Sequence, residues 1–67
     1  MEDNWSVVYT YNVLYHVEII KSVLEDNGIE SVFINRVDSN YLFGDIDLYV
    51  SNENFDKAKE IIASVDF

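Results

Sequence analysis

The order of the hydrophobic periods along the chain predicts an α+β domain. Apolar and aromatic residues alternate with others from 5 to 11, and extended patterns return at 29–36 and 45–51. The intervening and following segments are apolar at helical spacing instead, at Val13, Val17, Ile20 and Leu24 and then at Phe55, Ala58, Ile62 and Val65. The chain therefore reads strand, helix, strand, strand, helix, which is a split β-α-β unit without its last strand.

This order of elements predicts how the sheet is arranged. The second and third strands should be antiparallel, with one helix before the second strand and one after the third. This implies two helices on one face of a sheet whose spatial order is one, three, two. A fourth strand normally lies beside the first, and we expect the two residues after Val65 to be too few to form it. The first strand is then an open edge.

Three large aromatic residues mark this predicted edge strand. A regular strand places Trp5, Tyr9 and Tyr11 on one face, together with Val7. Exposed strands of this kind pair readily with other chains. We therefore expect a homo-oligomer that forms through the first strand.

Polar residues and a glycine predict where the helices begin and end. Asn12 is placed to cap the first helix, and Ser51 or Asn52 to cap the second. Asn27 and Gly28 should end the first helix, because glycine accepts the left-handed conformation often found there.

The third strand has the clearest alternation in the chain. Ile46, Leu48 and Val50 should face the core, and the opposite face should be in contact with solvent. That second face carries Asp45, Asp47, Tyr49 and Ser51.

Composition and charge narrow the classes of function. The 67 residues are expected to form a single domain over 1–67, and 13 acidic against four basic residues give a net charge of -9. This charge repels phosphate backbones and anionic lipids, so we expect neither nucleic-acid nor membrane binding. The chain has no cysteine, no signal-peptide pattern at its start and no apolar run long enough for a membrane span. A cytoplasmic protein is expected.

The connection between the second and third strands is unusual. Tyr41, Leu42 and Phe43 form a bulky apolar run where a loop is normally polar. The run can fold back as additional core, or it can form a contact surface for a protein partner. Both interpretations remain open.

Catalytic and metal-binding patterns are weak. Asp38, Asp45 and Asp47, within 37–47, offer carboxylates that could share a hard cation, although two carboxylates two residues apart on a strand are more often simply solvated. His16 is the single histidine and lies beside the apolar stripe of the first helix, with no nucleophile or carboxylate at a spacing that indicates catalysis. Gly28 and Gly44 lack the spacing of a phosphate-binding loop. We expect no enzyme activity and no cofactor, and the carboxylates give the alternative of a small-ligand or metal-binding module.

Several segments together resemble a bacterial family. The segments that carry the resemblance are 7–10, 24–29, Asn35, 38–39, Tyr41, 44–50 and Ala58 before Ile61 and Ile62. Through them the chain from Trp5 to Ile62 is similar to small domains described as putative prokaryotic signal-transducing proteins, whose biochemical role is undetermined.

The resemblance implies a ferredoxin-like fold related to PII-type nitrogen-regulatory proteins. In those proteins the loop between strands two and three meets the partners, and 37–44 is the corresponding stretch here. The present loop is much shorter and has no basic set for ATP phosphates. We therefore expect a small regulatory or protein-interaction module, without nucleotide sensing, whose partner-binding residues are Trp5, Tyr9, Tyr11, Tyr41, Leu42 and Phe43.

Overall fold

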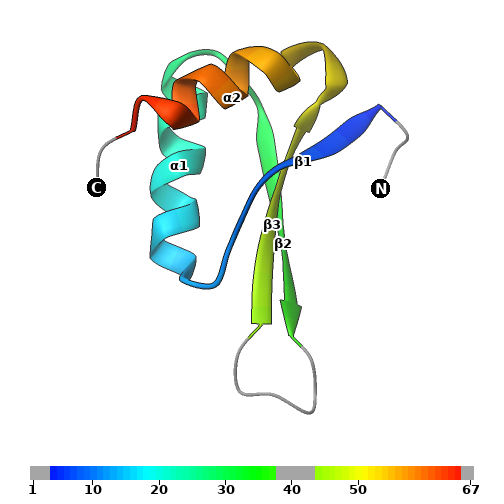
Figure 1. Cartoon of the computed structure of the whole chain (residues 1–67), viewed down its shortest axis with the longest axis vertical. Coiled ribbons are helices and arrows are strands. Elements are labelled where there is room, and N and C mark those ends of the chain that lie inside the picture. The colour runs from blue at the N-terminus through cyan, green and yellow to red at the C-terminus, as the bar shows by residue number, and fades with distance from the viewer. Residues whose placement is uncertain (1–3, 38–43, 66–67) are drawn as a thin grey trace.

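The computed structural model describes residues 4–37 and 44–65, and it has the predicted order of elements (Figure 1). The strands are β1 (Trp5–Tyr11), β2 (Ser31–Val37) and β3 (Gly44–Ser51). The helices are α1 (Leu14–Asp26) and α2 (Phe55–Ala63), and a short 3₁₀ turn, η1 (Asn52–Asn54), leads into α2.

The three strands form one antiparallel sheet in the order β1-β3-β2, which confirms the predicted topology. Because β3 is central, both β1 and β2 are edge strands. The prediction had named only the first strand as an open edge.

One face of the sheet and the two helices enclose the core. The residues that point from β3 into it are those predicted from its alternation, Ile46, Leu48 and Val50. The other fully or nearly buried apolar residues are Val8, Val17, Ile20, Leu24, Ile29 and Ala58. Every element except η1 contributes to this cluster or packs against it, so the small core depends on each of them.

The end of α1 confirms the role predicted for Gly28. Its φ angle is +78°, in the left-handed region. The amide of Gly28 donates to the carbonyl of Glu25 at 2.9 Å, and the amide of Ile29 donates to that of Leu24 at 2.9 Å. These two bonds form a Schellman motif, and Leu24 and Ile29 are both buried in the core. The turn thus aims β2 back along the helix it follows.

The predicted helix caps are wrong. Helix α1 begins after Val13, so Val13 and not Asn12 holds the N-cap position, and Val13 makes no side-chain capping hydrogen bond. Neither Ser51, which precedes η1, nor Asn54, which precedes α2, makes a capping hydrogen bond. Asn52 instead bonds to the N-terminal end of β1 and the residue before it. Its backbone N–H donates to the carbonyl of Asn4 at 2.8 Å, and its side-chain oxygen accepts a hydrogen bond from the hydroxyl of Ser6. Burial of the apolar stripe of each helix replaces the missing caps.

A β-bulge in β1 changes which residues share a face. Val7 lies opposite Tyr49 and Tyr9 lies opposite Leu48, so Val8 is an extra residue without a cross-strand partner. Val8 is buried in the core and Tyr9 packs against the same cluster. The strict alternation predicted for the first strand is therefore wrong.

Candidate interaction surface

The face of the sheet opposite the helices carries a group of exposed apolar side chains. Tyr49 of β3 lies between Val7 of β1 and Val32 of β2. Val7 and Val32 are each 39% exposed, and Ile34 is 38% exposed. Trp5, half-buried, lies on the same face opposite Ser51. We call this set, Trp5, Val7, Val32, Ile34 and Tyr49, the open face.

Asp47 lies within the open face and is not solvated, contrary to the prediction. It is only 6% exposed, and the hydroxyl of Thr10 donates a hydrogen bond to its Oδ1 at 2.9 Å. Thr10 and Ile34 flank it on the two neighbouring strands. A carboxylate on a central strand loses water to such neighbours, and the hydrogen bond offsets part of that loss. Asp45, nearer the strand end, is exposed as predicted.

Removing the hydroxyl of Thr10 should destabilise the fold. Thr10→Val keeps the shape of the side chain but takes one hydrogen bond from the buried Asp47, and we expect a loss of about 1.5 kcal/mol in the free energy of unfolding. Urea denaturation followed by circular dichroism measures this loss. Thr10→Ser, which keeps the hydroxyl, should lose clearly less. Equal stability of Thr10→Val and the natural chain would contradict this role of the hydroxyl.

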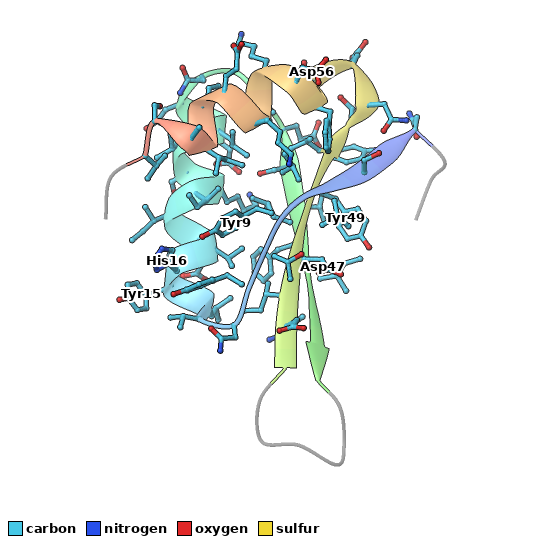
Figure 2. The ribbon with its side chains drawn as sticks, viewed as in Figure 1. Tyr9, Tyr15, His16, Asp47, Tyr49 and Asp56 are labelled. Atoms are coloured by element: carbon cyan, nitrogen blue, oxygen red, sulfur yellow. The ribbon has the colours of Figure 1, made fainter. Side chains whose placement is uncertain are left out.

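The three aromatic residues predicted on one face of the first strand do not share it. The bulge leaves Trp5 on the open face and turns Tyr9 and Tyr11 to the helix side, where they lie opposite Leu48 and Ile46. Figure 2 shows Tyr9 on the same side of β3 as α1 and Tyr49 on the other side. Tyr9 and Tyr11 therefore cannot form one contact surface with Trp5, because they lie on the opposite face.

His16 belongs to a small group of aromatic rings at the start of α1. Its ring centroid is 4.5 Å from that of Tyr11 and 6.0 Å from that of Tyr15, and the centroids of Tyr9 and Tyr11 are 6.1 Å apart. The side chain of His16 is half-buried, as its place beside the apolar stripe predicts. These contacts serve packing between β1 and α1.

Other predicted site residues fall outside the described residues. These are Tyr41, Leu42, Phe43 and Asp38, in the connection between β2 and β3. Within 4–37 and 44–65, no three histidine, cysteine or acidic side chains are grouped so that they could hold a metal ion. The described carboxylates Asp45 and Asp47 thus give the metal-binding alternative no support.

Sequence reasoning missed most of the open face. It placed Tyr49 beside two aspartates on a face expected to be wet, and it made no use of Val32 and Ile34. The alternation of Val32 and Ile34 with Phe33 was the available signal, because a strand joined to β3 in a hairpin must present alternate residues to the two faces.

No helix in the described part of the chain is both long and apolar enough to span a membrane.

Comparison of the chain with known proteins and protein families assigns it to one family. Among curated proteins and solved structures, none is significantly similar to this chain. The model of one family matches residues 5–66, nearly the whole chain. The chain therefore belongs to the family described as "Putative prokaryotic signal transducing protein", as its sequence resemblance implied.

Proposed function

We propose that this domain is a non-enzymatic protein-interaction module of prokaryotic signal transduction, and that it works by pairing the edges of its sheet with other chains. The family description supports a signalling role and names no reaction. We assign the module to the cytoplasm, a reducing compartment that the absence of cysteine fits.

The observation that carries this proposal is the lack of carboxylates on both edge strands. The chain has 13 acidic residues among 67, yet neither β1 (Trp5–Tyr11) nor β2 (Ser31–Val37) contains one. Edge strands in monomeric proteins are usually blunted by charged residues, proline or short length. Each edge here is seven residues long and has no proline, and β2 has a single charged residue, Arg36.

Exposed apolar side chains next to both edges support the same proposal. Val7 on β1 and Val32 on β2 belong to the open face and lie on the two edge strands. A chain that paired with either edge would extend the sheet and bring its own side chains beside Val7 or Val32. The net charge of -9 then keeps the remaining surface soluble and favours partners without a strong negative charge.

Self-association tests this proposal most directly. At high micromolar concentration, light scattering behind a sizing column should give a mass well above the 7.8 kDa of one chain. Pairing through β1, as the sequence predicted, and pairing through β2 both give this result. A strict monomer under these conditions would rule out assembly through the sheet edges.

A further inference from the structure

We propose that the domain forms a two-fold symmetric dimer in which β2 pairs antiparallel with β2 of a second copy, centred on Phe33. The two three-stranded sheets then become one continuous sheet. This inference rests on the proposed function and assigns it an edge, an occupant and a register.

The regularity of β2 favours this edge over β1. All residues from Ser31 to Val37 pair with β3 in unbroken register, whereas the bulge at Val8 interrupts β1. A bulge twists an edge strand and disturbs the row of amides and carbonyls that an incoming strand must meet. Figure 1 shows β2 at the side of β3 away from β1, so a second copy can reach it without displacing β1.

Symmetry leaves few registers for this pairing. In a continuous sheet, residues directly opposite each other point to the same face. A two-fold axis perpendicular to the sheet must therefore lie between one residue of β2 and its own counterpart in the second copy, and the central choices are Val32, Phe33 and Ile34. Centring on Val32 sets Ile34 opposite Glu30, and centring on Ile34 sets Val32 opposite Arg36, so both oppose an apolar residue to a charged one.

Centring on Phe33 matches every opposing pair in chemical character. Val32 lies opposite Ile34 of the second copy on the open face, and Phe33 lies opposite its own counterpart on the helix face. Glu30 comes opposite position 36, which is an arginine in the sequence. The pairs of unlike positions occur twice because of the symmetry, and the Phe33 pair occurs once. Such cross-strand pairs are the unit that stabilises sheets, and opposite charges at the ends counter the repulsion between two acidic chains.

The same register gives a neighbour to an unsatisfied hydroxyl. Ser31 is 3% exposed, and its Oγ has no hydrogen-bond partner among the described residues. A buried polar atom without a partner costs free energy. Pairing about Phe33 sets the exposed Asn35 of the second copy opposite Ser31, and its amide can donate or accept.

Two valines with the same surroundings provide a matched test of the edge. Val7 and Val32 both lie opposite Tyr49, on either side of it, and both are 39% exposed. Val32→Lys should weaken self-association roughly tenfold or more, since it disturbs two apolar pairs and brings like charges together at the interface. Val7→Lys changes the net charge equally and should leave the dimer intact. Sedimentation equilibrium measures both, and circular dichroism confirms that each variant is folded.

Cysteine cross-linking tests the register, because the natural chain has no cysteine. Val32→Cys and Ile34→Cys chains, one of them tagged, are mixed and oxidised with diamide. A mixed disulfide dimer should form, since a bridge needs Cα atoms within about 7 Å and only unlike positions lie opposite each other. Each variant alone should cross-link far less. These exposed positions keep the test independent of the core.

The outcomes separate this inference from the proposed function. Loss of the dimer in Val32→Lys alone, together with the mixed disulfide, supports pairing of β2 about Phe33. Loss in Val7→Lys alone overturns this inference but leaves assembly through a sheet edge standing, at β1. Efficient disulfide formation by either cysteine variant alone overturns the register. A natural chain that stays monomeric overturns both the inference and the proposed assembly.

Discussion

Replacing Leu48 with alanine is expected to leave most of the protein unfolded at room temperature. Leu48 is fully buried at the centre of β3, between Tyr9 and Phe33 of the two edge strands. A buried leucine truncated to alanine typically loses about 3–5 kcal/mol, through lost transfer free energy and the cavity left behind. A domain of this size has roughly 3–5 kcal/mol in total. Urea denaturation followed by far-ultraviolet circular dichroism measures the loss.

An exposed residue of similar size provides the control. Ile19 lies on α1 and is 41% exposed, so Ile19→Ala removes little buried surface and gains helix propensity. Its stability should stay within about 1 kcal/mol of that of the natural chain. If Leu48→Ala were as stable as Ile19→Ala, the core would not be centred on β3.

Replacing Gly28 with valine should lower the free energy of unfolding by about 2 kcal/mol, since a β-branched residue is poorly tolerated in the left-handed region. Among the described residues other than Gly28 and its two chain neighbours, no atom lies within 4 Å of the place a β-carbon would take, and the φ angle of Gly28 is +78°. The cost is therefore conformational and does not come from a clash. The denaturation midpoint in urea gives the measurement.

A graded series at position 28 separates this cause from simple loss of flexibility. Asparagine tolerates positive φ better than other residues with a side chain. The expected order of stability is glycine, then Gly28→Asn, then Gly28→Ala, with Gly28→Val the least stable. A series in which Gly28→Val was more stable than Gly28→Asn would show that the left-handed turn does not limit stability here.

The sequence was most informative where a local pattern coincides with the buried surface. The order of elements, the β1-β3-β2 arrangement and the inward residues Ile46, Leu48 and Val50 are all as predicted. Gly28 also ends α1 as predicted. In each case one physical requirement, either alternation across a sheet or a positive φ angle, selects the residue directly.

The candidate site was less predictable because it depends on contacts between strands. The sequence predicted Trp5 as a contact residue, but the bulge at Val8 places Tyr9 and Tyr11 on the opposite face of the sheet from Trp5. Only the pairing of β1 and β2 with β3 brings Val7, Tyr49 and Val32 together. No period within one strand contains that information.

By itself, then, the sequence determined the α+β class, the strand order, most residues of the core and the family. The tertiary structure decided which residues form the open face and that Asp47 is buried beside Thr10. It also showed that the N-cap residues of α1 and α2 make no side-chain capping hydrogen bonds. The physical reason is the separation along the chain over which each kind of interaction acts. Periodicity and turn preferences act between residues close in the chain, whereas a bulge, a shielded carboxylate and two comparable sheet edges result from packing between distant segments.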